Sequence, residues 1–246
     1  MKPVHGADIE AVVFDWGGTL SVWADVDAED MWRLAARRLA PGREHELLRV
    51  LVALEKEAWD RVETDRRSTC LAELLATASA AVEVVVADAV LDEAAQCHLD
   101  SWAPHIRHRE DAGCVLSSLR AAGLRVGLLS NTYWPRLFHE RLLERDGLAP
   151  HIDAGLYTCE MGRVKPDPSV FRAALDALDV SDPARAVFVG DRLLDDVSGA
   201  RAAGMRSVWV RNQVTPPYDV VPDAVVEALG ELPGVLARWG VGHARV

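Results

Sequence analysis

The chain has 246 residues, half of them hydrophobic, which predicts a globular protein with one large domain or a domain carrying an insert. Its formal net charge of −11 argues against nucleic acid or an anionic membrane as the main partner. No stretch approaches the ~20 apolar residues of a membrane span, and the N-terminus lacks the pattern of a signal peptide, so we expect a cytoplasmic protein.

The first predicted element is a buried strand, the apolar run from Ala11 to Phe14. Asp15 follows it, and the strand must end there because Gly17 and Gly18 come next. An acidic side chain therefore lies at the carboxyl end of a strand, which is the edge where open α/β sheets bind ligands. Two glycines at this point allow the backbone to approach a ligand closely.

Helical periodicity follows over about ninety residues. We predict helices at 25–39 and 44–62, a third capped by Ser68, and a fourth at 91–102, with 82–90 as a loop and helix start. This stretch therefore predicts an all-α insert at 21–106.

From residue 110 onward, helices and strands alternate. The predicted helices are 111–122, 135–145, 169–178, 194–203 and 220–239, and the predicted strands are 124–129, 152–157, 186–190 and 207–210. Such alternation indicates right-handed βαβ units and a parallel sheet. Since the first strand belongs to this sheet, we predict an α/β fold. Its three-layer, Rossmann-like core comprises 1–20 and 107–246, which the helical insert interrupts.

Polar side chains fall at the ends of these strands or in the loops after them. Asp15 ends the first strand, Ser130 and Asn131 follow the second, Lys165 lies in the loop after the third, and Asp191 ends the fourth. Because the carboxyl ends of parallel strands share one edge, we expect these side chains to converge.

The chemistry of this set indicates phosphoryl transfer. Two neighbouring carboxylates repel unless a cation lies between them, and Asp15 with Asp191 offers hard oxygen ligands for Mg²⁺. The Ser130 hydroxyl, the Lys165 ammonium and the N–H groups of the glycine turn can hold phosphate oxygens. Asp15 is then a candidate nucleophile, with the metal and the lysine neutralising the developing charge.

Four motifs in this order resemble the haloacid dehalogenase superfamily. They are Asp-x-x-Gly-Thr, Ser-Asn, Lys-Pro-Asp-Pro, and Val-Gly-Asp followed by Asp-Asp-Val-x-Gly-Ala-x-x-Ala-Gly-Met. The resemblance covers roughly residues 9–20 and 110–240. It implies that the inserted helices form a cap domain, with hinges near 20–24 and 103–109, and that the substrate is a small phosphorylated metabolite. We expect a monomer or a homodimer.

The resemblance also implies roles for individual residues. Asp15 is implied as the nucleophile, Lys165 as the charge-balancing lysine and Ser130 as a phosphate contact. Further substrate or phosphate contacts are expected from Trp16, Gly17, Gly18 and Asn131.

The implied metal ligands are Asp15, Asp191 and the carbonyl oxygen of Gly17. Asp196 corresponds to the second acid of the fourth motif. Asp195 is expected beside it on the first turn of a helix, where negative charge is favoured.

One departure from the family pattern concerns catalysis directly. Phosphatases of this family usually carry a second Asp two residues after the nucleophile, which protonates the leaving group and then activates water. Gly17 occupies that position, and loss of a general acid–base typically costs ~10²–10⁴ in rate. The sequence therefore favours formation of an aspartyl-phosphate over its rapid hydrolysis. Candidate replacement groups are His98, His105, His108 and Glu160.

Other reactions remain open at this stage. Phosphonoacetaldehyde hydrolases have a small residue at the Gly17 position and use a cap lysine as a Schiff base, for which Lys56 is the candidate. Dehalogenases of the superfamily have an aromatic residue there and need no metal, so Asp191 argues against them. A binding or regulatory module without catalysis is the third alternative.

The remaining aromatic and sulfur-containing residues are interpreted as structural. Core packing is favoured for the tryptophans of the insert and its joints, which are Trp23, Trp32, Trp59 and Trp102, whereas Trp16 and Trp134 are expected near the cleft. The four cysteines lack metal or disulfide spacing and are predicted to be buried, reduced thiols.

Overall fold

The computed structural model describes residues 9–241. Within them, six strands form one fully parallel sheet of order β3-β2-β1-β4-β5-β6. The strands are β1 (Ala11–Phe14), β2 (Arg125–Ser130), β3 (Ala154–Tyr157), β4 (Ala186–Gly190), β5 (Arg206–Val210) and β6 (Ala224–Val226). Along the chain, β2 and β3 are added on one side of β1, and β4, β5 and β6 are then added on its other side. The order therefore reverses between β1 and β4, the point at which such sheets bind ligands.

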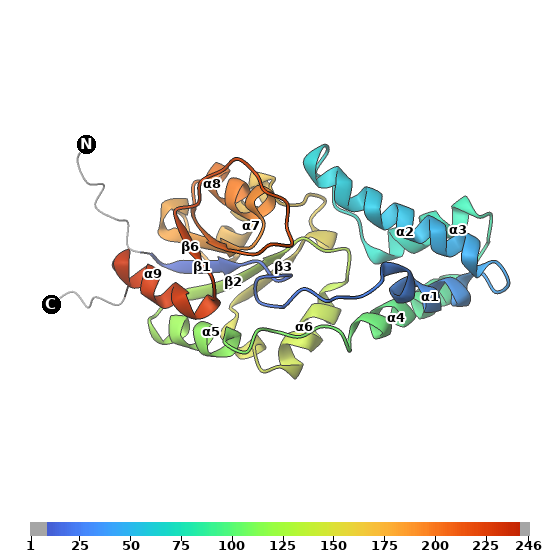
Figure 1. Cartoon of the computed structure of the whole chain (residues 1–246), viewed down its shortest axis with the longest axis horizontal. Helices are drawn as coiled ribbons and strands as arrows, with labels where there is room; N and C mark the ends of the chain where they lie inside the picture. Colours follow the sequence, from blue (N-terminus) through green and yellow to red (C-terminus); the bar gives the residue numbers. More distant parts are fainter. Residues whose placement is uncertain (1–8, 242–246) are drawn as a thin grey trace.

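Helices cover both faces of the sheet, giving three layers (Figure 1). One face carries α5 (Ala112–Ala121), α6 (Arg136–Arg145) and α9 (Leu232–Arg238), and the other carries α7 (Pro168–Ala177) and α8 (Gly199–Ala202). Side chains of β1 alternate between the two layers: Val12 and Phe14 pack in one core, Ala11 and Val13 in the other. Both faces of this strand are buried, which explains its continuous apolar sequence. The predicted three-layer α/β core is confirmed.

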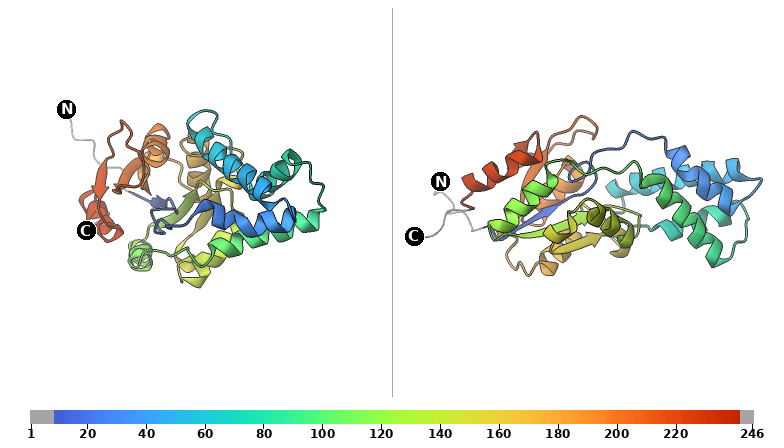
Figure 2. Two further views of the ribbon diagram at one scale, coloured as in Figure 1. Left: turned by 45° about the vertical axis from the view of Figure 1, so that its right-hand side comes forward. Right: turned by 90° about the horizontal axis from the view of Figure 1, so that it is seen from below.

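Four helices lie between β1 and α5: α1 (Ala28–Leu39), α2 (Glu44–Asp60), α3 (Leu71–Ala81) and α4 (Asp88–Trp102). We call residues 28–102 the helical segment. Helix α1 packs against α2 and α4, and α3 packs against the same two helices. The helical segment projects from the sheet beyond the end of β1 (Figures 1 and 2). Its buried side chains, including Trp32 and Leu47, belong to the same hydrophobic cluster as Val12 and Phe14.

The predicted terminal helix at 220–239 is wrong in its first half. Residues 224–226 form β6 at the edge of the sheet, and α9 begins only at Leu232. Pro222 disfavours a helix here, since proline lacks the N–H that a helix interior requires. The carboxylate of Asp223 accepts hydrogen bonds from the backbone N–H and hydroxyl of Ser207, which anchors β6 beside β5. The predicted helix at 194–203 begins instead as a π-helix, Leu193–Ser198, and continues as α8.

The structure also bears on membrane-spanning helices and on the cysteines. No helix of the described residues is both long and apolar enough to cross a bilayer. The four cysteines are free, as predicted, but Cys114 is exposed and the other three are only half-buried. The prediction of buried thiols is therefore wrong.

Candidate functional site

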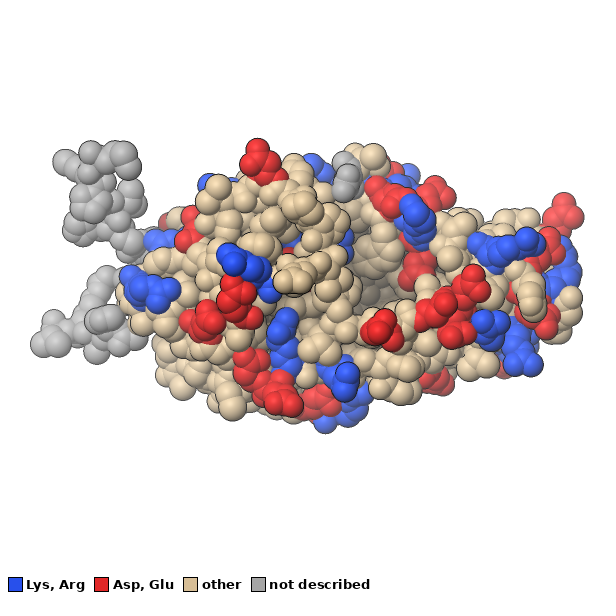
Figure 3. Space-filling model, in the orientation of Figure 1, with Lys and Arg blue, Asp and Glu red and all other residues tan. Residues whose placement is uncertain are grey.

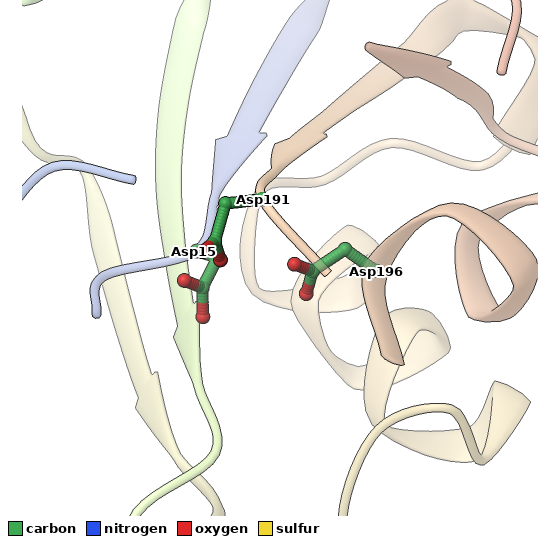
Figure 4. A group of neighbouring side chains, drawn as sticks. All are labelled: Asp15, Asp191 and Asp196. Carbon is green, nitrogen blue, oxygen red and sulfur yellow. The ribbon is translucent and has the colours of Figure 1, made fainter. Parts of the chain in front are cut away.

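Three aspartates meet at the point where the strand order reverses. Asp15 follows β1, Asp191 follows β4, and Asp196 points toward them from the π-helix (Figure 4). One carboxylate oxygen of each lies within 4.8 Å of the others, and all three side chains are buried. The convergence expected from the shared sheet edge is thus present in the structure.

Lys165 provides the one ammonium group that contacts these aspartates among the described residues. Its Nζ donates to Asp15 Oδ1 at 2.6 Å and to Asp196 Oδ1 at 2.8 Å. Burial alone lowers the pKa of Lys165, but the two carboxylates outweigh burial and raise it above its ordinary value. Lys165 therefore remains charged at neutral pH and fixes one oxygen of Asp15.

The remaining oxygens of the cluster fit a divalent cation. Asp15 Oδ2 and Asp191 Oδ1 are buried and have no hydrogen-bond partner. Burial raises the pKa of Asp15 to about 6, with Lys165 opposing it, and burial and the neighbouring carboxylates raise the pKa of Asp191 to about 8. In Asp196 both oxygens are engaged, one by Lys165 and the other by the backbone N–H of Arg192 at 2.9 Å. Unpartnered hard oxygens are thus supplied by Asp15 and Asp191, whereas Asp196 orients Lys165.

Asp191 is held by contacts that the sequence did not reveal. Its Oδ2 accepts hydrogen bonds from Trp23 Nε1 at 3.0 Å and from Asn212 Nδ2 at 3.1 Å. Gly18 adopts a φ of +84°, and a Cβ at this position would collide with both the Trp23 indole and the Asp191 carboxylate. Glycine at 18 therefore satisfies a backbone requirement and a close packing requirement together. Asn212 follows β5, so the same rule of strand ends could have identified it.

Ser130 and Asn131, at the end of β2, both line the cavity, and Asn131 also contacts the loop that carries Lys165. Ser130 is buried at the end of β2 and lines the cavity. The Asn131 amide donates to the Lys165 carbonyl at 3.0 Å and accepts from the Lys165 N–H at 2.8 Å. These two bonds position Lys165, and Asn131 also lines the cavity with a second amide hydrogen that neither bond uses. Its contact with phosphate stays a prediction.

A cavity of about 370 Å³ opens beside this cluster, within the size range of small-molecule sites. The strand ends and the segments that follow them contribute Asp15, Ser130, Lys165 and Asp195, the last in an ion pair of 2.7 Å with Arg192. The helical segment contributes the opposite wall, and the space-filling view shows the hollow between them (Figure 3).

Aromatic side chains make up much of the cavity wall. Trp16 and Trp134 line it as expected, but so do Trp23, Trp59 and Trp102. Of the four tryptophans assigned to core packing, only Trp32 is fully buried. The preference for core packing was therefore wrong for Trp23 and Trp59, which are exposed, whereas Trp102 packs against the core cluster and also lines the cavity.

His108 and Asp146 orient the Trp16 ring through two successive hydrogen bonds. Its Nε1 donates to His108 Nε2 at 3.0 Å, and His108 Nδ1 lies 2.6 Å from Asp146 Oδ2. Since an indole N–H can only donate, His108 Nε2 must accept and its proton must be on Nδ1. Burial also lowers the pKa of His108. His108 thus holds the Trp16 ring in place as a neutral group.

None of the four predicted replacement acids lines the cavity in the described part of the chain. His105 is exposed, and Glu160 pairs with Arg136 at 2.7 Å on the surface. Lys56, the Schiff-base candidate, is exposed and pairs with Asp60. Schiff-base chemistry requires a desolvated amine, so the structure offers no support for that alternative.

His98 is buried in the helical segment, where both ring nitrogens are engaged. Nδ1 donates to the Met31 carbonyl at 3.2 Å, Nε2 accepts from Trp134 Nε1 at 3.4 Å, and the ring stacks on Trp32 at 3.7 Å. Burial lowers the pKa of His98 to about 3. His98 is therefore neutral near pH 7, and its one ring proton is hydrogen-bonded to the Met31 carbonyl, so His98 cannot act as the acid for a leaving group.

The buried His98 should make the protein sensitive to acid. Between pH 6.5 and 3 the unfolded chain binds the His98 proton and the folded chain does not, so stability falls as the pH falls. From pH 7 to pH 5 the wild type should lose about 2 kcal/mol more unfolding free energy than the His98→Gln variant. Urea unfolding of both proteins at the two pH values measures the difference. Parallel pH profiles would contradict this assignment.

The sequence of the chain is similar to a known hydrolase family and to individual phosphatases. A family model for haloacid dehalogenase-like hydrolases matches residues 9–204. The chain is similar to a phosphoserine phosphatase of Thermus thermophilus, with 42% identity over 123 residues covering 50% of this chain and 48% of that protein. It is also similar to a plasmid-encoded phosphoglycolate phosphatase of Cupriavidus necator, with 36% identity covering 49% and 52% of the two chains. The chain thus spans about half the length of these relatives.

Solved structures match over nearly the whole chain. A 2-haloacid dehalogenase from Pseudomonas syringae superposes with a TM-score of 0.66 at 28% identity, covering 94% of this chain and 100% of that one. A phosphatase from Thermococcus onnurineus shares the fold, with a TM-score of 0.62 at 23% identity and coverage of 97% and 100%. From the family match and the converging site residues, the chain belongs to the haloacid dehalogenase-like hydrolases.

Proposed function

We propose that this chain is a Mg²⁺-dependent phosphatase that transfers the phosphoryl group of a small phosphorylated metabolite to Asp15 and then to water. The observation that carries the proposal is the pair of buried, unpartnered oxygens on Asp15 and Asp191 beside the Lys165 ammonium. The relatives named as phosphatases support the same reaction class.

In this proposal the residues of the site divide the work of phosphoryl transfer. A carboxylate oxygen of Asp15 attacks phosphorus, a P–O bond forms, and the bond to the leaving alcohol breaks. Lys165 offsets negative charge on Asp15, while the Ser130 hydroxyl and the N–H groups of the glycine turn bind phosphoryl oxygens. Asp15, Asp191 and the Gly17 carbonyl would hold Mg²⁺, which supplies positive charge for the phosphoryl oxygens when bound.

Both halves of the reaction lack a dedicated acid or base at position 17. No side chain is available at Gly17 to protonate the leaving alcohol or to deprotonate water, and both protons must pass through solvent. Hydrolysis of the aspartyl-phosphate is then the slow step.

We also propose that residues 21–106 act as a cap domain over the strand ends, with hinges near 20–24 and 103–109. Support comes from the cavity, whose walls come from both the sheet and the helical segment. A cap of this kind excludes water and selects the substrate.

Metal removal tests the proposed function. With Mg²⁺, the purified chain should release phosphate from 4-nitrophenyl phosphate. Chelation with EDTA should reduce the rate at least about 100-fold because two carboxylates would face the substrate without a cation, and added Mg²⁺ should restore it. Beryllium fluoride with Mg²⁺ should also raise the melting temperature. Turnover that survives complete chelation would contradict the metal requirement.

Carbon–halogen cleavage is the second candidate, favoured by the likeness to the Pseudomonas syringae dehalogenase over almost the full chain. A departing halide needs no proton, so this reaction would tolerate glycine at position 17. Release of chloride from 2-chloropropionate in the presence of EDTA would support it. The two unpartnered carboxylate oxygens argue for the phosphatase.

A further inference from the structure

Glu55 places a negative charge on the wall that α2 contributes to the cavity. Its Oε1 accepts a hydrogen bond from the Tyr133 hydroxyl and its Oε2 accepts one from Trp32 Nε1, both at 2.6 Å. Two short bonds fix the carboxylate in one orientation, but both donors are neutral. They orient the charge without compensating it.

No cation of the protein neutralises Glu55 within residues 9–241. The cationic residues that line the cavity are Lys165 and Arg192, and each forms an ion pair with an aspartate. The neighbouring imidazole, His98, is neutral because burial lowers its pKa to about 3. Among the carboxylates that line the cavity, Glu55 is thus the one without an ion pair in the described chain. A half-buried, unpaired charge is costly unless a cation approaches it.

The surroundings of Glu55 are aromatic. Ring centroids lie 6.3 Å apart for Trp59 and Tyr133, 5.9 Å for Tyr133 and Trp134, and 5.1 Å for Trp134 and Trp102. Aromatic faces attract ammonium groups, most strongly where water is excluded, and aromatic walls are typical of quaternary ammonium sites. A fixed carboxylate within such a wall favours an organic cation over a neutral group.

The same wall connects this end of the cavity to the nucleophile. The Trp134 ring lies 6.0 Å from Trp16, which directly follows Asp15. A ligand in the cavity of about 370 Å³ can therefore place one end at Asp15 and the other near Glu55. The two ends have opposite preferences, because the first suits a phosphate and the second suits a cation.

We propose that Glu55 and the rings of Trp59, Tyr133 and Trp134 bind a substituted ammonium group, so that the preferred substrates are phosphate monoesters of small amino alcohols. This inference rests on the proposed phosphatase function and specifies its substrate class. Glu55 determines specificity in this role and takes no part in bond breaking.

A pair of esters with the same shape tests the inference. Phosphocholine and 3,3-dimethylbutyl phosphate differ by a positively charged nitrogen in place of a carbon atom. The wild type should show a kcat/KM at least about 10-fold higher for phosphocholine, and Glu55→Gln should bring this ratio close to one. Glu57→Gln, two residues away on the exposed side of α2, should keep the wild-type ratio. Equal kcat/KM values for the two esters in the wild type would overturn the inference.

A binding measurement separates the subsite from the reaction. Choline should quench or shift the tryptophan fluorescence of the wild type without Mg²⁺, 3,3-dimethylbutanol should do so at least about 10-fold more weakly, and Glu55→Gln should lose the choline response. Choline binding without hydrolysis of either ester would leave the ammonium site standing and reject the phosphatase. Hydrolysis of both esters at equal rates, with no selective choline binding, would retain the phosphatase and reject the ammonium site.

Discussion

The Asp15→Asn variant should hydrolyse aryl phosphates at least about 10⁴-fold more slowly than the wild type. An amide oxygen cannot form the acyl-phosphate that the reaction requires, and it removes one of the charges that would bind the metal. The amide oxygen can still accept the hydrogen bond from Lys165, so the fold should survive. Phosphate release under saturating Mg²⁺, with melting temperatures of both proteins, measures the two effects.

A neighbouring aspartate serves as the control. Asp195 also lines the cavity but pairs with Arg192, and Asp195→Asn should cost far less than Asp15→Asn. Two variants with similar residual rates would show that charge loss near the cavity explains the defect, and the nucleophile would have to be another group.

The Gly17→Asp variant should hydrolyse phosphate esters ~10²–10⁴-fold faster than the wild type, because it supplies the missing general acid–base. The structure has room for this change. A Cβ built at Gly17 has no atom within 4 Å, and Gly17 lines the cavity. The adjacent Gly18 contrasts with it, since a side chain there would collide with Trp23 and Asp191.

The gain should depend on the leaving group and on the proton. Alkyl phosphates, whose alcohols leave poorly without protonation, should gain more than 4-nitrophenyl phosphate. In rapid mixing, the wild type should release nitrophenol in a stoichiometric burst from the slowly hydrolysed phospho-enzyme, and Gly17→Asp should remove the burst. Gly17→Asn has the same shape without the carboxyl group. If it were as fast as Gly17→Asp, the rate would not be limited by proton transfer.

The sequence allowed prediction of the groups that lie at strand ends. Asp15, Ser130 and Asp191 could be placed because parallel strands share one carboxyl edge, which local periodicity is enough to locate. Lys165 could be placed in a loop, although its contact with both Asp15 and Asp196 follows from tertiary structure. The family resemblance then supplied roles that spacing alone does not encode.

Residues contributed by other parts of the fold escaped prediction. Trp23, from the connection between β1 and α1, and Glu55, from α2, line the same cavity as the strand ends only through the tertiary arrangement of these elements. For the candidate histidines the error was the reverse, because they were expected at the cavity and do not line it. They lie close to a predicted hinge along the chain, but this does not determine where their side chains point. His98 points into the helical segment, and His108 contacts Trp16. Strand β6 was missed because three residues with valines carry too little periodicity to distinguish an edge strand from a helix.

The shared hydrophobic cluster of the sheet and the helical segment bears on protein engineering. Trp16 and Tyr133 are buried in a cluster that also contains Trp32 and Leu47. The inserted helices are therefore not an accessory that can be cut away to leave a minimal scaffold. A truncated chain lacking them would expose an apolar surface that favours self-association. A variant redesigned for another substrate must likewise keep the hydrophobic contacts between the sheet and the helical segment.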